Sequence, residues 1–236
     1  MNTALKTLRL HFVKRNTVIL TPLLILLSVV VVTVLISLTL QRVGIDPADP
    51  NYPLQARNNA GVLWALGGFV VALGVQSVAT TFPFAMALGA DRRGFTVGTL
   101  LSHVVMAAGL AAVISLLLLV ELATDHWLIN AYALDAYLLG GGNPLLAFLI
   151  SFLAIWLLQS VGAAFGAGWL RYGVRGPIFI GLIAGLVLVL ILLAIAPQIP
   201  AIIEAFQPWW LIIAAAIIIL IGVLGQYLFL RRATTR

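Results

Sequence analysis

Residues 82–98 read FPFAMALGADRRGFTVG and lie between the second and third long apolar runs of the chain. They contain Asp91, Arg92 and Arg93, and the apolar runs on both sides carry no charge. Charged side chains are costly in hydrocarbon, so this segment is expected to leave the membrane between two spans. We call residues 82–98 the charged corner, and predict that it faces water while the chain around it lies in lipid.

The composition places the chain among integral membrane proteins. Hydrophobic residues make up 63% of the 236 positions and charged residues 8%, and the mean hydropathy is +1.16. A soluble domain is about half apolar and a quarter charged. We therefore predict one transmembrane domain over residues 1–236. The net charge of +6 does not indicate nucleic-acid binding, because the basic residues fall at the ends of apolar runs, as membrane topology requires.

Six apolar runs are long enough to cross a bilayer, since a helix needs about 20 residues to span about 30 Å of hydrocarbon. The predicted fold is all-α and polytopic. Its spans are approximately residues 17–40, 61–82, 97–120, 144–169, 177–196 and 209–230.

The connecting segments carry further predictions. Residues 1–16 alternate apolar and basic side chains, which favours an amphipathic helix on the membrane surface. Pro83 should break the second apolar run and leave a short helix over residues 84–90. Residues 122–143 are too short to cross and rich in aromatics, which predicts a helix at the interface.

Six spans place both termini on one side of the membrane, together with the charged corner. That side holds eleven of the thirteen lysines and arginines, and the other side holds six of the seven acids. The positive-inside rule therefore predicts that both termini are cytoplasmic.

The sequence contains no constellation typical of catalysis. Its acids lie at scattered positions on the outer loops, and its three histidines fall in three different membrane zones, so we predict neither an enzyme nor a metal site. Lysine occurs only at positions 6 and 14, which excludes a G-x-x-x-x-G-K phosphate loop. Energy from a nucleotide would have to come from another polypeptide.

Several neutral polar side chains lie within the predicted spans. Such groups hold helices together or line a path, and the sequence does not decide between these roles. The small-residue pattern from Gly162 to Gly166 permits close helix packing, within the chain or at a dimer seam. The candidates for a path or a seam are Gln76, Ser77, Thr80, Gln159 and Ser160.

The charged corner, continued as FPFAMALGADRRGFTVGTLL, resembles the loop after the second span of small permease subunits of type-2 ABC exporters, especially those of Gram-positive bacteria. The matching features are the F-P-F entry, a short helix ending in Leu88-Gly89, and the run from Arg92 to Gly98. The six-span layout and the basic N-terminal helix match as well. The segment between spans five and six is shorter than in larger relatives.

This resemblance implies a function. It implies a permease of the bacterial plasma membrane that forms a homo- or heterodimer, contacts membrane lipid, and moves a hydrophobic or amphipathic substrate outward. Two copies of a separate cytoplasmic ATPase would bind ATP and Mg, so this chain would need no cofactor of its own. The loop would act as a coupling helix through Phe82, Pro83, Phe84, Asp91, Arg92, Arg93 and Phe95.

Two other classes of function stay open on the residues alone. An ion-coupled secondary carrier usually keeps an ionisable group near the membrane midplane, and no acid or basic residue lies deep in a predicted span here. A membrane scaffold or sensor that transports nothing would need no such group.

Overall fold

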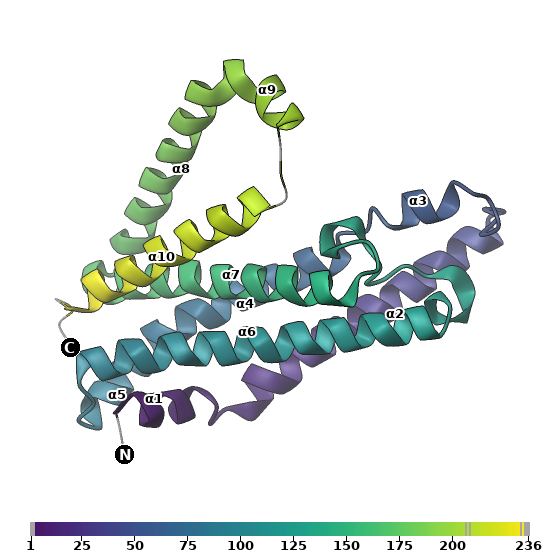
Figure 1. The fold of residues 1–236 in the computed structure, drawn as a ribbon. Helices are drawn as coiled ribbons and strands as arrows, with labels where there is room; N and C mark the ends of the chain where they lie inside the picture. The colour runs from purple at the N-terminus through teal and green to yellow at the C-terminus, as the bar shows by residue number, and fades with distance from the viewer. Residues whose placement is uncertain (1–2, 206, 208, 232, 234–236) are drawn as a thin grey trace. The chain divides into compact units, whose positions relative to one another are not determined.

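The protein is described here from a computed structural model, which covers residues 3–205, 207, 209–231 and 233. The described chain is helical and has no strand (Figure 1). Its α-helices are α1 (Thr3–His11), α2 (Thr21–Arg42), α3 (Tyr52–Ala56), α4 (Gly61–Ala79), α5 (Thr81–Ala87), α6 (Arg92–Ala123), α7 (Pro144–Tyr172), α8 (Arg175–Ile195), α9 (Ile199–Glu204) and α10 (Trp209–Arg231). Short turns of other helix types are η1 (Asn16–Leu20), η2 (His126–Asn130), η3 (Tyr137–Leu139) and η4 (Ala196–Gln198).

Six helical segments among the described residues are long and apolar enough to cross a membrane, which confirms the predicted number. They are Asn16–Arg42, Tyr52–Ala87, Arg92–Ala123, Pro144–Tyr172, Arg175–Ile202 and Trp209–Arg231. Each contains the whole of the corresponding predicted span. The third is longer than predicted, because α6 begins at the charged corner itself and runs for 32 residues. At 1.5 Å per residue α6 is about 48 Å long, more than the hydrocarbon core needs.

Contacts within the chain form two compact units, where the sequence predicts one domain. Unit 1 comprises residues 1–10, 71–100 and 157–236, and unit 2 comprises residues 11–70 and 101–156. Each unit is described by itself.

The core of unit 1 is formed by helix ends that pack around the charged corner. The rings of Phe82 and Phe95 meet edge to face with centroids 5.1 Å apart, and both side chains are fully buried. The same cluster includes Val78, Ala85, Ala163, Ala167, Leu230 and Ala233. Leu10 of α1 packs against it, so α1, α5 and the adjoining ends of α6, α7 and α10 share one apolar core.

A glycine seam joins α4 and α7 within unit 1. A methyl group on Gly162 would collide with the backbone carbonyl of Val71, and one on Gly166 would lie 2.6 Å from that of Val75. A methyl group on Gly74 would in turn lie 2.9 Å from the Cα atom of Gln159. The small-residue pattern predicted from the sequence therefore serves packing inside the chain.

The last two spans, α8 and α10, both belong to unit 1 and differ in how many of their residues are buried. The residues of α10 that are buried are Ile219, Gly222, Gln226 and Leu230, which recur every three or four residues and form one stripe. In α8 only Gly176, at the beginning of the helix, is buried. Figure 1 shows α8 and α10 diverging from this end, with α9 at the far tip between them.

Unit 2 contains α2 and α3, parts of α4, α6 and α7, and a long loop over residues 124–143. The predicted interfacial helix in this loop is wrong, because only short irregular turns form there. Asp125, His126, Trp127, Leu128 and Asn130 all have positive φ, between 50° and 64°. Non-glycine residues rarely adopt such angles, so the surrounding contacts must hold this backbone in place.

Candidate functional site

The charged corner consists of a short helix, a glycine turn and a capped helix start. The break comes at Thr80, and the short helix is α5 over Thr81–Ala87 instead of residues 84–90. Pro83 explains the position, because a proline removes the hydrogen bond to the residue four positions earlier and disrupts the helix on its N-terminal side. Gly89 turns the chain with a φ of +80°.

Asp91 caps the start of α6. Its Oδ2 accepts a hydrogen bond from the backbone N–H of Gly94 at 2.7 Å. This bond, and a second from the Thr3 hydroxyl, lower the pKa of Asp91. The carboxylate therefore stays charged at neutral pH and holds both the first turn of α6 and the beginning of α1.

The aromatic residues of the charged corner fall into two groups. Phe82 and Phe95 belong to the core, so the prediction that they belong to a docking surface needs correction for their side chains. Phe84, on α5, and Leu88, directly after it, are 55% and 68% exposed. The sequence could not separate these groups, because burial and docking favour the same residue types.

Arg92 binds the end of α10. Its Nη1 donates to the carbonyl oxygens of Leu230 and Arg231 at 2.8 and 2.7 Å, and its Nη2 donates to that of Ala233 at 2.9 Å. The last carbonyls of a helix have no partner within the helix and carry partial negative charge, so a guanidinium there is a favourable cap. Arg92 therefore ties the charged corner to the sixth span.

The N-terminal helix packs directly on the start of α6. A methyl group on Gly94 would lie 2.7 Å from Thr3 Cβ, and one on Gly98 would lie 2.6 Å from Thr7 Cβ. Ala4 and Thr7 are the buried residues of α1, whereas Leu5 is 49% exposed. The face that contacts protein is thus made of small residues, and the apolar face predicted from the sequence is left partly free.

We expect Gly98→Leu to detach α1, because a side chain there would occupy the space of Thr7 and the Ala4 carbonyl. The chain has no cysteine, so a Thr7→Cys reporter can be labelled alone. Thr7 is 2% exposed, and its reaction with a thiol reagent should be slow in the parent and at least about tenfold faster with Gly98→Leu. Gly109→Leu is the control, since nothing lies within 4 Å of a methyl group there. Equal labelling in both variants would contradict this packing.

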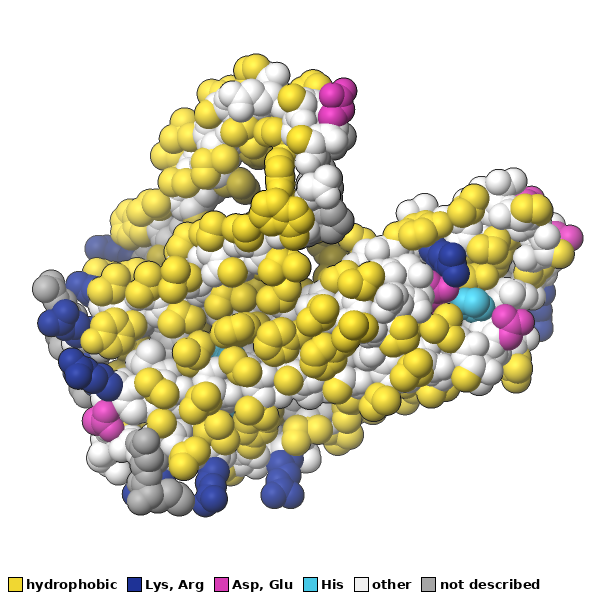
Figure 2. All heavy atoms as spheres, in the orientation of Figure 1, with side chains coloured by type: hydrophobic (Ala, Val, Ile, Leu, Met, Phe, Trp, Pro, Cys, Tyr) yellow, Lys and Arg dark blue, Asp and Glu magenta, His cyan; other side chains and the backbone are white. Residues whose placement is uncertain are grey.

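A basic cavity of about 180 Å³ opens beside Arg92, and we call it the arginine cavity. It lies between the first turn of α6 and the last turns of α10, where Figure 2 shows lysine and arginine side chains gathering. Its lining residues are Arg92, Arg93, Thr96, Tyr227, Leu230 and Arg231. Arg232 and Arg236, which the topology prediction also counts, lie outside the described residues.

The polar residues predicted for a path or a seam do not line one continuous surface. Gln76 on α4 and Thr80 at the break after it are exposed, whereas Gln159 and Ser160 are buried on α7. The hydroxyls of Ser77 and Thr80 donate to carbonyl oxygens of their own helix at 2.7 Å. Within the described chain, the side-chain amide of Gln159 is buried without a hydrogen-bond partner.

The sequence analysis missed a cluster of charged residues in unit 2, which we call the loop cluster. The fully buried carboxylate of Glu121 accepts hydrogen bonds from the backbone N–H groups of Ala133, Leu134 and Asp135, at 2.8–3.1 Å. It also accepts one from Trp127 Nε1 at 3.0 Å. One side chain at the end of α6 therefore fixes the loop at four points.

Asp135 is the second buried acid of the loop cluster. Arg57 donates to its Oδ2 from Nε and Nη2, at 3.0 and 2.8 Å, and His126 Nε2 lies 3.1 Å from the same oxygen. Both carboxylates bind groups of this chain, so the loop cluster holds the loop in place. Nothing in the sequence marks these partners, which come from segments up to 78 residues apart.

The described residues contain no group of three or more histidine, aspartate or glutamate side chains arranged to hold a metal ion. The placement of the three histidines in separate membrane zones stays a prediction.

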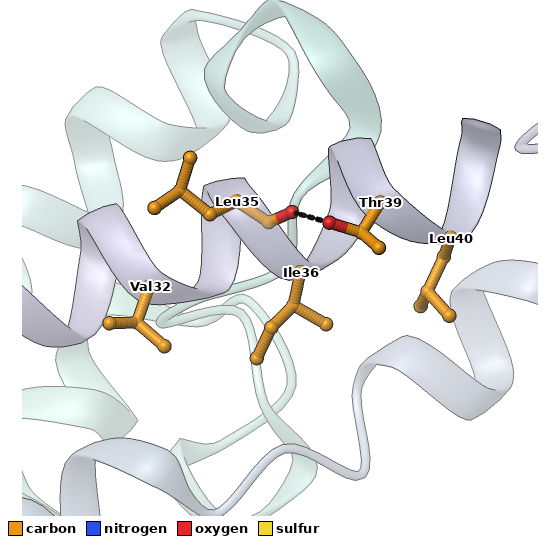
Figure 3. A pocket seen from close by; sticks show the side chains of 5 residues that line it. All are labelled: Val32, Leu35, Ile36, Thr39 and Leu40. Atoms are coloured by element: carbon orange, nitrogen blue, oxygen red, sulfur yellow. Dashed lines mark hydrogen bonds between the residues drawn. The ribbon is translucent and has the colours of Figure 1, made fainter. Parts of the chain in front are cut away.

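The apolar groove on α2 is lined by one helix alone. Figure 3 shows its residues, Val32, Leu35, Ile36, Thr39 and Leu40, around a volume of about 250 Å³. Its single hydroxyl, on Thr39, donates to the Leu35 carbonyl at 2.7 Å. With no free polar group, this surface suits lipid chains.

No protein-family model, curated protein or solved structure matches this chain.

Proposed function

We propose that this protein is the permease subunit of a type-2 ABC exporter in a bacterial plasma membrane. The observation that carries the proposal is the construction of the charged corner. Its short helix α5 exposes Phe84 and Leu88, while Phe82 beneath them is locked into the core of unit 1. A short helix with an exposed apolar face can bind a partner, and its rigidly packed buried face can transmit the partner's motion to the spans.

The partner would be a separate ATPase that binds ATP and Mg. Closure of two ATPase copies would move α5, and the rigid contacts would carry this motion into the spans. Phe95 carries it into α6, and the three hydrogen bonds of Arg92 carry it to the end of α10. In this role Arg92 is a positioning residue, and Phe84 and Leu88 are the contact residues.

A second permease subunit would complete the transport path. We place the seam near spans two and five, and the exposure of α8 supports this. Leu182, Ile183 and Leu186 are each more than 60% exposed, and a methyl group on Gly185 would meet nothing within 4 Å. A hydrophobic or amphipathic substrate, such as a lipid, an antimicrobial peptide or a drug, suits a path without charges.

Co-purification tests the proposal. The chain should be produced together with a stand-alone ATPase encoded beside its gene, and purified through a tag on the permease. We expect the two proteins in equal numbers of copies, with two of each in the complex. A permease that never retains the ATPase would instead favour an ion-coupled carrier or a scaffold.

The proposed orientation, with both termini in the cytoplasm, predicts a labelling pattern. An impermeant thiol reagent added outside should reach Asp49→Cys and Asp125→Cys and should miss Arg93→Cys. Asp125 is a suitable reporter because its side chain is 92% exposed, whereas Asp135 is fully buried and would resist labelling in either orientation. Permeabilised cells control for reactivity, since Arg93→Cys should then be labelled. Labelling of Arg93→Cys in intact cells would contradict the orientation.

A further inference from the structure

The arginine cavity is lined by positively charged residues, and no acid among the described residues lines it. Arg92 is satisfied by the carbonyl oxygens at the end of α10. The guanidinium groups of Arg93 and Arg231 have no hydrogen bond or ion pair in the described part of the chain. The nearby Asp91 attracts Arg93 electrostatically, but its hydrogen bonds come from Gly94 and Thr3. Arg93 and Arg231 therefore place positive charge beside one cavity.

The size and chemistry of the arginine cavity indicate the group that fits. Pockets for drug-sized molecules measure about 300–1,000 Å³, and this one measures about 180 Å³. It can hold a compact anion but not a whole amphipathic molecule. Arginine binds phosphate oxygens through two parallel N–H donors, and Tyr227 is a further lining residue of the cavity.

An apolar strip leads from the arginine cavity along α10. Ile217, Ile221, Leu224 and Leu228 are each 49–62% exposed and recur at the spacing that places them on one helix face with Arg231. From residue 217 to residue 231 this face is about 21 Å long, more than the roughly 15 Å of one leaflet's hydrocarbon. A phosphate in the cavity would therefore have a surface for an acyl chain directly beside it.

We propose that the arginine cavity binds the phosphate of an anionic phospholipid headgroup, with an acyl chain along the apolar strip of α10. A free phosphate offers the same oxygens to Arg93 and Arg231, but it would leave the strip unused. Basic pockets at the inner ends of spans are common places for anionic headgroups. This inference does not depend on the proposed transport function, since a carrier or a scaffold could hold a lipid in the same way.

The test compares lipid binding to the purified full-length protein in two kinds of nanodisc. One contains phosphatidylcholine alone, and the other contains equal parts of phosphatidylcholine and phosphatidylglycerol. After mild extraction, native mass spectrometry counts the lipids retained. We expect retained phosphatidylglycerol on the parent protein, with an affinity about 30-fold lower when Arg93→Gln and Arg231→Gln are combined. This factor corresponds to about 1 kcal/mol for each arginine near an anionic lipid.

Two control variants separate a specific site from general attraction to the surface. Arg175→Gln removes a charge at the beginning of α8, away from the cavity lining, and should change the retention less than twofold. Arg93→Lys with Arg231→Lys keeps the charge and should restore most of the binding. Arg92 is left intact in all variants because it caps α10. Equal loss in Arg175→Gln and the glutamine pair would overturn the site.

A further arm distinguishes the source of the phosphate. Inorganic phosphate should not displace the lipid, because it cannot use the apolar strip. Displacement by inorganic phosphate, or equal retention of phosphatidylcholine, would overturn the lipid assignment. Loss of ATPase co-purification in the glutamine pair with lipid retention unchanged would also overturn it, and would assign the arginines to a protein carboxylate.

Discussion

Replacing Glu121 with alanine is expected to release the loop of residues 124–143 and to destabilise unit 2 by about 3–5 kcal/mol. The carboxylate accepts three backbone N–H groups and the Trp127 indole N–H, and it is fully buried. Alanine would leave four donors without an acceptor. The loop backbone adds to the effect, because its non-glycine residues at positive φ are already held in an unfavourable conformation.

Two readouts check this expectation. Thermal unfolding in detergent reports the global effect, and an Ala133→Cys reporter, 1% exposed in the parent, reports local opening. Asp125→Asn is the control, because it changes an exposed acid of the same loop and asparagine also tolerates positive φ. The control should stay within about 0.5 kcal/mol of the parent. A Glu121→Ala protein with parental stability and an unreactive Ala133→Cys would show that the loop does not depend on this carboxylate.

Combining Phe84→Ala with Leu88→Ala should abolish ATPase binding while leaving the permease folded. Both side chains are more than half exposed, so their removal creates no cavity in the core of unit 1. Apolar anchors at the centre of a protein interface each contribute about 2 kcal/mol or more, so losing both should weaken binding about 1,000-fold. Co-purification of the ATPase, with the permease's thermal unfolding as the check on folding, measures both effects.

Trp64→Ala is the matched control for this pair. It removes an aromatic side chain that is 80% exposed near the beginning of α4, far along the helix from the charged corner. ATPase binding should be unchanged. Arg92→Lys would not distinguish ATPase docking from a structural role of Arg92. It would disturb the three hydrogen bonds to the end of α10 whether or not an ATPase docks there.

The six spans could be predicted from the sequence because they depend on a simple property. Each is an uncharged run of sufficient length, and hydrocarbon tolerates little else. The helix break near Pro83 was also predictable, although its position shifted by three residues because proline disrupts the turn before it. Irregular backbone could not be predicted from the sequence. The turns at Asp125–Leu128 place Trp127 and Leu128 at positive φ, which these residue types rarely adopt, so the interfacial helix was the wrong expectation.

The contacts of the candidate site could be predicted only in part. Counting charges selected Arg92, but its partners lie 138–141 residues away along the chain. The ring contact of Phe82 with Phe95 depends on the turn between α5 and α6, which the sequence marks only through Gly89. The pairing of Arg57 with Asp135 requires two loops to meet, and charge counting predicts only that both lie on the same side of the membrane.

The central claim is that this chain converts the ATPase cycle into transport through the charged corner. The most direct measurement is ATP hydrolysis by the partner ATPase in proteoliposomes, with substrate added, in the presence of the parent permease, the Phe84→Ala/Leu88→Ala variant or no permease. We predict that substrate stimulates hydrolysis only with the parent and with the Trp64→Ala control. Equal stimulation by the parent and by the Phe84→Ala/Leu88→Ala variant would contradict coupling through α5, and equal hydrolysis without any permease would contradict the proposed function itself.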